Sequence, residues 1–484
     1  MHRFYPLLRV FGALLIGFSV CLAVPMALSW LVEDGAHSVF DEAFVATLAC
    51  GLALFLGLFR ESRELKVRDG FLLVVLVWTV LPLFACLPFV LYLDVSFTDA
   101  YFEAASGLTA TGATVLSGLD AMPLSINFWR TFMHWIGGMG VVVLAVAILP
   151  LLGIGGRQMF KAETPGPMKE SKLTPRIAET AKGLWGVYLL LTTACGLTLW
   201  LLGMEPWDAL MHAFSVMGLG GFSTKDASLG HFGSVAIETA VMVFALLSGI
   251  NYATHFMALH GRSLLPYRRD PEAPYFLGVL AASILGLTVF LLARGVFEGF
   301  GEALRYVAFH SISVATSLGF ATTDYGQWPV FAQLWMLFLS SFAACSGSTG
   351  GGIKMIRAMI LYKQVYRELI HAMHPSALWP VRVRGVPVPP DILTAVLAFG
   401  FAYMCIIVVF TLVMSASGLD IVTAFSAVVA CLNNVGPGLN QVGPATTFAV
   451  LDDLQTWVCI FAMLLGRLEI FTLLVVLTPA FWLK

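Results

Sequence analysis

Four loops in the sequence share a glycine at one register. They read SGLTATGATV, SVMGLGGFST, SVATSLGFAT and ACLNNVGPGL, and the shared glycines are Gly112, Gly221, Gly319 and Gly436. Glycine permits backbone conformations with positive φ, which can aim successive carbonyl oxygens to one side. A cation that leaves water needs oxygen ligands, and a ring of carbonyls supplies them without a fixed charge. These loops could together coordinate a cation through backbone oxygens.

The loops lie in a repeat of roughly a hundred residues, which indicates one structural unit used several times around an axis. A second glycine follows each loop: Gly138, Gly249, Gly347 and Gly466. A short apolar or amphipathic stretch precedes each loop, and the C-terminal end of such a helix favours a cation. Packing between membrane helices would also explain the glycines, but it would not explain a short helix before every loop.

A run of small residues interrupts what otherwise resembles a single membrane helix over 330–370. The run is Gly347, Ser348, Thr349, Gly350, Gly351 and Gly352. Irregular backbone at membrane depth survives only where it is buried in protein or faces water. We therefore expect an intramembrane loop that borders a pore or cavity. The run is not a phosphate-binding loop, since it lacks the Gly-Lys-Ser/Thr ending and no strand precedes it.

Three basic residues are candidates for a functional role near this loop. Arg467 lies inside the last apolar run, where a charge costs about 2.5–3.5 kcal/mol and should face a cavity or partner. An ion pair with Glu469 is not favoured, because residues two apart point to different helix faces. Lys354 and Arg357 follow the glycine run and are either part of a gate or ordinary charges at the cytoplasmic boundary.

Membrane helices must position these loops. The chain is 59% hydrophobic and 12% charged, whereas average soluble chains carry about 25% charged residues. Apolar stretches long enough to cross a bilayer are expected at 6–32, 38–59, 71–93, 127–153, 183–203, 234–260, 275–293, 330–370, 392–417 and 454–481. Shorter stretches near 98–110, 207–217, 301–316 and 420–431 are the size of re-entrant helices. Only one outgoing helix, 330–370, is expected to be strongly broken.

The fold class is therefore an all-α polytopic membrane protein in the lipid bilayer. Two leading helices (1–68) precede four units of helix, pore helix, filter loop and helix around a pseudo-fourfold pore. The units are expected at 69–156, 157–262, 263–375 and 376–484, the third carrying the intramembrane loop. Most of the 27 Lys and Arg residues fall on one side of these spans, so both termini are predicted to be cytoplasmic.

At these loops the sequence resembles the TrkH/KtrB potassium transporter superfamily, and most of all its TrkH branch. The resemblance covers essentially the whole chain, including the two leading spans and the motifs MGLGGFSTKD, ATSLGFATTDYGQWP, NNVGPG and GSTGGGIK. It implies a K⁺-selective pore of four pseudo-repeats in one chain, in a bacterial inner membrane. It also implies a homodimer and a cytoplasmic nucleotide-binding regulatory ring, the TrkA-type subunit. The basic segments 154–182 and 353–390 are candidates for docking that ring.

The resemblance also assigns roles to residues. The filter carbonyls would come from Thr111, Gly112, Gly220, Gly221, Leu318, Gly319, Val435 and Gly436. The residues before them, Ala110, Leu219, Ser317 and Asn434, would extend the ladder. Residues 347–352 with Arg467 would form the gate. Some plant relatives with Ser in the first loop prefer Na⁺, so Gly112 favours K⁺, with Rb⁺ as a surrogate.

Several alternatives remain open at this stage. The pore could be an obligately ion-coupled K⁺ symporter driven by H⁺ or Na⁺, or could admit Na⁺. An alternating-access carrier is disfavoured because its helix breaks should come in inverted pairs. The sequence has no intramembrane nucleophile–base set or His-Glu-x-x-His motif, so an enzyme is not expected. Neither are an organic cofactor or a nucleic-acid partner; K⁺ would be the transported ion.

Overall fold

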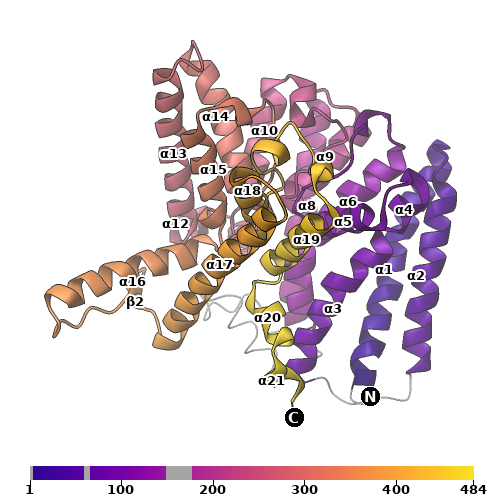
Figure 1. Cartoon of the computed structure of the whole chain (residues 1–484), viewed down its shortest axis with the longest axis horizontal. Helices are drawn as coiled ribbons and strands as arrows, with labels where there is room; N and C mark the ends of the chain where they lie inside the picture. The colour runs from indigo at the N-terminus through magenta and orange to yellow at the C-terminus, as the bar shows by residue number, and fades with distance from the viewer. Residues whose placement is uncertain (1–3, 59–65, 149–176, 484) are drawn as a thin grey trace.

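The computed structural model describes residues 4–58, 66–148 and 177–483, and the regular structure in these ranges is almost entirely helical (Figure 1). The exception is a short hairpin of β1 (Arg382–Val383) and β2 (Val386–Pro387). The leading helices are α1 (Tyr5–Val32) and α2 (His37–Gly57). They approach closely at Gly12 and Gly51, where a β-carbon on Gly12 would lie 2.9 Å from the Gly51 carbonyl oxygen. Small residues permit such close helix contacts in membranes.

The first two repeats follow the predicted order of helix, short helix, loop and helix. Repeat 1 contains α3 (Val67–Ala85), α4 (Leu87–Leu93), α5 (Phe97–Leu108) and α6 (Leu124–Ile148). Repeat 2 contains α8 (Ile177–Leu201), α9 (Pro206–Gly218), α10 (Val235–Ser248) and α11 (Tyr252–Gly261). The predicted boundary between them, at 156/157, lies outside the described residues, as does most of segment 154–182.

The other two repeats use the same order. Repeat 3 contains α12 (Leu265–Arg269), α13 (Ala273–Ala293), α14 (Phe300–Ala315), α15 (Val330–Phe342) and α16 (Met355–Met373). Repeat 4 contains α17 (Pro390–Ala416), α18 (Ile421–Leu432), α19 (Asp453–Arg467), α20 (Phe471–Leu477) and α21 (Pro479–Trp482). Short 3₁₀ turns lie at Leu119–Ala121, Ser228–Phe232, Tyr325–Gln327, Asn440–Val442 and Phe448–Val450.

The short helices α5, α9, α14 and α18 are the predicted re-entrant pore helices. Local sequence determines where two of them begin. The Ser96 hydroxyl accepts from the Asp99 amide at the start of α5, and the Asp420 carboxylate accepts from the Thr423 amide at the start of α18. Such caps satisfy amide groups that have no partner within the helix. All four helices lie within a few residues of the re-entrant stretches predicted near 98–110, 207–217, 301–316 and 420–431.

The described residues contain six helices that are long and apolar enough to cross a membrane, or eight spans if two bent helix pairs each count as one. Within the described residues, the predicted span at 127–153 overlaps α6, and the predicted span at 330–370 is divided between α15 and α16; neither is among these six helices. The fold is that of an all-α, multi-pass membrane protein, as predicted.

The expectation that only one outgoing helix is strongly broken is wrong. The direction changes by 95° between α10 and α11 and by 114° between α19 and α20, and residues 343–354 separate α15 from α16. At the first break the Asn251 side chain accepts from the Ala253 amide and starts a new helix. At the second, Glu469 and Ile470 both have positive φ, 55° and 53°. Neither of these two breaks contains a run of glycines from which the sequence could have predicted it.

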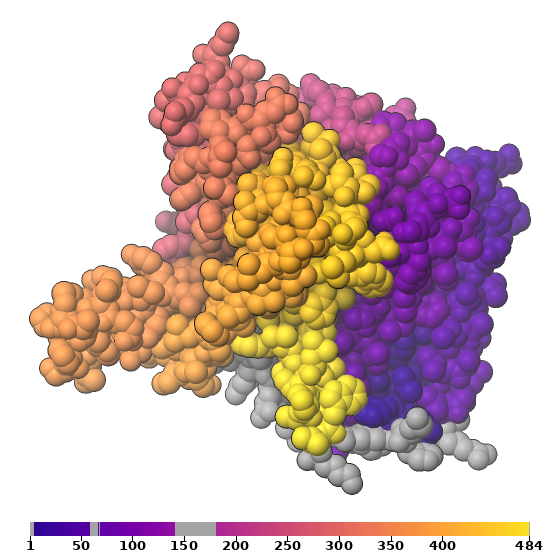
Figure 2. Space-filling view, in the orientation of Figure 1, coloured from indigo at the N-terminus to yellow at the C-terminus, as the bar shows by residue number. Residues whose placement is uncertain are grey.

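Beyond its break, α16 does not continue in the direction of α13 and α15. It projects from the body and, with the β hairpin that follows it, forms an arm at the left of Figures 1 and 2. The arm (residues 355–389) exposes large apolar side chains, including Tyr362, Val365, Leu369, Met373 and Leu378.

Candidate functional site

The four predicted filter loops have the same backbone conformation. The filter glycines Gly112, Gly221, Gly319 and Gly436 have φ of 81°, 82°, 81° and 97°. Two residues earlier, Ala110, Leu219, Ser317 and Asn434 have φ of 51°, 52°, 62° and 51°. Residues other than glycine rarely adopt positive φ, so its occurrence at one register in every repeat marks a shared and constrained structure.

A hydrogen bond common to the four repeats ties each loop to its pore helix. The residue just before the filter glycine donates its amide to the carbonyl five positions earlier in the chain. The pairs are Thr111 with Ser106 (2.9 Å), Gly220 with Ser215 (3.0 Å), Leu318 with Ser313 (2.8 Å) and Val435 with Ala430 (2.9 Å). The pore helix thus leads directly into the loop, and its C-terminal carbonyl groups lie near the filter residues.

The four loops meet in a closed ring. Each filter glycine lies against the carbonyl oxygen of the residue that precedes the filter glycine of the next repeat. The pairs are Gly112 with Gly220, Gly221 with Leu318, Gly319 with Val435 and Gly436 with Thr111. A β-carbon on the first residue of each pair would lie 1.8, 2.2, 2.2 and 2.9 Å from that oxygen. The structure therefore brings together all eight residues predicted to supply filter carbonyls.

Two of the residues predicted to extend the ladder, Asn434 and Ser317, make side-chain contacts beside this ring. The Asn434 side-chain amide donates to the Thr111 hydroxyl (2.9 Å) and to the Met463 carbonyl (3.1 Å). The Ser317 hydroxyl accepts from the Gly351 amide (2.8 Å). These two side chains connect the filter to the neighbouring loop and to the run 347–352.

The run 347–352 lies against the inner ends of three pore helices. The Thr349 hydroxyl donates to the Met217 carbonyl at the end of α9 (3.0 Å). A β-carbon on Gly350 would lie 2.8 Å from the Thr316 carbonyl oxygen, just after α14, and one on Gly351 would lie 2.0 Å from the Asn433 carbonyl oxygen, just after α18. Side chains other than hydrogen would not fit at these two places, so the glycines allow the loop to close against the filter.

Arg467 connects this loop to the remaining repeat. Its guanidinium donates to the Thr349 carbonyl (2.9 Å) and to the Gly137 carbonyl on α6. The side chain is only 7% exposed, and its guanidinium carbon lies 5.6 Å from the centre of the Trp78 ring. The prediction that Arg467 meets the broken segment of repeat 3 agrees with these contacts.

The predicted register of the second glycine needs correction in repeats 3 and 4. Gly138 lies against Gly218 and Gly249 against Thr316, in each case at the pore-helix end of the next repeat. Gly351 makes the corresponding contact with Asn433, whereas Gly347 lies against the Asn251 side chain of repeat 2. The glycine equivalent to Gly138 and Gly249 is therefore Gly351. Gly466 of repeat 4 instead lies against the Leu432 carbonyl of its own repeat, as Gly137 lies against the Leu108 carbonyl in repeat 1.

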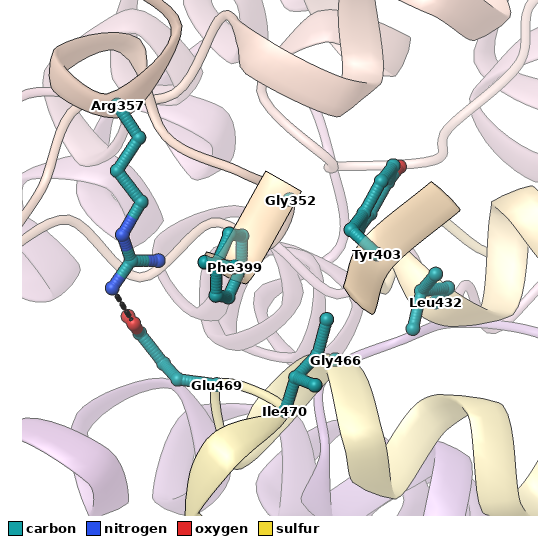
Figure 3. Close-up of a pocket in the computed structure, with 8 residues that line it drawn as sticks. All are labelled: Gly352, Arg357, Phe399, Tyr403, Leu432, Gly466, Glu469 and Ile470. Atoms are coloured by element: carbon teal, nitrogen blue, oxygen red, sulfur yellow. Dashed lines mark hydrogen bonds and ion pairs between the residues drawn. The ribbon is translucent and has the colours of Figure 1, made fainter. Parts of the chain in front are cut away.

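Lys354 and Arg357 are both buried beside the loop rather than free at the membrane boundary. The Lys354 ammonium donates to the Gly350 carbonyl. Arg357 forms an ion pair with Glu469 and stacks 4.3 Å from the centre of the Phe399 ring. Figure 3 shows this ion pair at one side of a small pocket, which Gly352 of the loop and Gly466 of α19 also line. The pocket lies between the loop and the α19–α20 break.

Sequence reasoning missed Glu272, which precedes the α13 span. One of its carboxylate oxygens accepts from the Ser346 amide (2.9 Å) and from the Ile356 amide (3.0 Å), so it joins the two ends of the loop. Burial, reinforced by the nearby Asp270 carboxylate, raises the pKa of Glu272 to about 7 despite these hydrogen bonds. The position of an acidic residue directly before an apolar span was the sequence feature that could have indicated this role.

Sequence reasoning also missed the groups that support the outer part of the loops. Glu103 of α5 is fully buried and pairs with Arg130 (2.8 Å). The buried His134 ring accepts from the Phe222 amide (3.3 Å). His212 and His310 each lie nine residues before a filter glycine, a shared spacing that could have revealed them.

Comparisons with known proteins agree with this arrangement. The family model described as "TrkH: Cation transport protein" matches residues 36–483. The Trk system potassium uptake protein TrkH of Salmonella typhimurium is 46% identical over 484 residues, which cover 100% of both chains. TrkG of Escherichia coli, with the same system name, is 36% identical and covers 97% of both. The crystal structure of the potassium transporter TrkH from Vibrio parahaemolyticus superposes with a TM-score of 0.90 at 45% identity, covering 99% of this chain and 100% of that one. The chain belongs to the TrkH family of cation transport proteins.

Proposed function

We propose that this protein carries K⁺, and Rb⁺ as its surrogate, into the cell through the ring formed by the four filter loops. The observation that carries the proposal is the cyclic contact of each filter glycine with a carbonyl of the next repeat. A closed ring of carbonyl oxygens can replace the water around a cation. The names of the relatives, potassium uptake proteins, favour K⁺ as that cation.

The loop 347–352 and Arg467 form the gate in this proposal. The loop contacts pore helices of repeats 2, 3 and 4, while Arg467 joins it to repeat 1. A loop in this position obstructs the path below the ring. Its glycines allow it to rearrange.

Assembly and orientation extend the proposal. The protein works as a homodimer in the bacterial inner membrane, with both termini cytoplasmic and a TrkA-type nucleotide-binding ring controlling the gate. The exposed apolar side chains of the arm support an interface, since they project from the body of the protomer (Figure 2). The arm connects directly to the loop through Lys354 and Met355, so a force on the arm would reach the gate.

The proposal is tested in a bacterium that lacks its own K⁺ uptake systems. Expression of this protein with its regulatory subunit should restore growth at low K⁺ and initial uptake of Rb⁺. Well-expressed protein that restores neither would refute the proposal. An obligate H⁺ or Na⁺ symporter is distinguished by removing the driving ion: a channel-like pore retains K⁺ flux down the K⁺ gradient, whereas a symporter does not.

A further inference from the structure

The pore helices of the first three repeats carry a polar side chain nine residues before the filter glycine. These residues are Glu103, His212 and His310. All three are fully buried. In repeat 4 this position is Ala427, and the adjacent Ser426 is the buried polar residue instead. A polar group at this depth needs a partner, so its partner indicates its role.

In three repeats the partner is the amide three residues after the filter glycine. The Glu103 carboxylate accepts from the Val115 amide (3.2 Å), and the Ser426 hydroxyl accepts from the Leu439 amide (2.9 Å). The His310 Nε2 atom accepts from the Thr322 amide (3.2 Å) and from the Thr323 amide (3.4 Å). Three different side chains thus hold the same point of the backbone, where the chain leaves the filter.

In repeat 2 the histidine acts through a hydroxyl group, and the supported amide is that of Lys225, four residues after the filter glycine. The His212 Nε2 atom lies 3.0 Å from the Ser223 hydroxyl, which in turn accepts from the Lys225 amide (3.1 Å). Its Nδ1 atom lies 2.8 Å from the Asp208 carbonyl. A carbonyl only accepts, so Nδ1 carries the proton and Nε2 is the acceptor.

Repeat 3 is the place where this support depends most on one side chain. The His310 Nδ1 atom donates to the Tyr306 carbonyl (2.8 Å), so Nε2 must be unprotonated to receive its two amides. No other acceptor for those two amides occurs in the described part of the chain. Loop 1, by contrast, is also held by Arg130, whose guanidinium lies 3.3 Å from the Thr114 hydroxyl.

We propose that His310 is a positioning residue for the selectivity filter. By accepting from the Thr322 and Thr323 amides, it holds the third loop so that the Leu318 and Gly319 carbonyls stay in the ring. Preference for K⁺ over Na⁺ requires ligands held at the correct spacing or field strength. This inference rests on the proposed filter, so its test includes a variant of the filter itself.

Two substitutions test the hydrogen bonds of the two His310 nitrogen atoms one at a time. In His310→Asn the amide can still donate to the Tyr306 carbonyl but is too short to reach the loop. In His310→Gln the amide oxygen takes the place of Nε2 and can accept from the loop. The matched control is His255→Asn, since His255 is also buried and hydrogen-bonded, to the Leu247 carbonyl and Tyr267 hydroxyl, but lies on α11 away from the filter.

Initial rates of Rb⁺ and Na⁺ uptake are measured in the K⁺-uptake-deficient bacterium, and protein in the membrane is quantified for every variant. We expect His310→Asn to lower the Rb⁺/Na⁺ uptake ratio about tenfold, because the Thr322 and Thr323 amides lose their acceptor. His310→Gln should stay within about twofold of wild type. His255→Asn should leave the ratio unchanged. If His310→Asn does not accumulate, His310→Leu replaces it and should show the same loss.

The outcomes separate this inference from the proposed function. Equal ratios for His310→Asn and His310→Gln, together with a lowered ratio for Gly319→Ala, would overturn the positioning role and leave the filter in place. Unchanged ratios in all three variants would mean that the ring is not the filter. A lowered ratio in the His255→Asn control would show that any buried histidine has this effect, and would also overturn the inference.

Discussion

Replacement of Arg467 by alanine tests the gate most directly. The substitution removes both hydrogen bonds that tie the loop to repeat 1, to the carbonyl groups of Thr349 and Gly137. We expect K⁺ flux to rise, because the closed position of the loop loses its support. The preference for K⁺ over Na⁺ should change little, since neither bond involves the filter ring. Deletion of residues 347–352 should act in the same direction.

The size of the effect follows from the contacts. A hydrogen bond to a charged group contributes about 1.5–3 kcal/mol, so two bonds set a ceiling of about 3–6 kcal/mol. The guanidinium is buried, however, and its removal also ends a desolvation cost. A net loss equal to one bond, about 1.5–3 kcal/mol, would shift the balance between closed and open loop by roughly 10- to 150-fold. Flux would rise until the filter itself limits it.

The assay is Rb⁺ uptake in the K⁺-uptake-deficient bacterium, with and without the regulatory subunit. Arg467→Lys separates tethering from charge: an ammonium keeps the charge but does not offer the planar fork of a guanidinium, so an intermediate flux is expected. Arg305→Gln is the matched control and should leave the flux unchanged. Arg305 forms a two-point ion pair with Glu238 (2.7 Å for both bonds) near the start of α14, whereas the loop contacts Thr316 beyond the other end of that helix. A well-folded Arg467→Ala protein with reduced flux would refute the gate assignment.

Three further predictions follow from buried groups and close contacts. Gly112→Ser should lower the K⁺/Na⁺ flux ratio, because its β-carbon would meet the Gly220 oxygen at 1.8 Å; an unchanged ratio would count against the ring as the filter. Arg130→Met should destabilise the protein by about 3–5 kcal/mol by leaving the Glu103 carboxylate unpaired, and adding Glu103→Gln should recover much of the loss in thermal unfolding. Burial raises the pKa of Glu272 from 4.5 to about 7, so its contribution to stability is full below pH 4.5 and is lost as the pH rises through 7. The melting temperature of wild type should fall over this window relative to Glu272→Gln, and parallel profiles would contradict the assignment.

Local sequence was sufficient to predict the four filter loops. A glycine at one register, a short helix before it and a long helix after it are all features of neighbouring residues, and each has a direct backbone consequence. Positive φ at Gly112 and its equivalents follows from residue type. The start of α5 at Ser96 and of α18 at Asp420 follows from capping. These elements lie within a few residues of their predicted positions.

The breaks in the other outgoing helices could not be predicted in this way. Glu469 and Ile470 adopt positive φ although neither is glycine, and such a conformation persists only when surrounding structure imposes it. Glu469 is held by its ion pair with Arg357, which lies far away in sequence. The role of Glu272 was hidden for the same reason, since its partners Ser346 and Ile356 belong to another segment.

The sequence by itself determined the membrane-spanning class and predicted four repeats with a shared glycine, because hydropathy, periodicity and glycine placement act through neighbouring residues. Only the tertiary structure decided how the loops close into a ring, which glycine of repeat 3 meets Asn433, and what holds the run 347–352. These depend on contacts between distant segments, made by Arg467 and Glu272, whose partners are backbone groups. Every residue carries those groups, so residue type alone does not show which of them a side chain will meet.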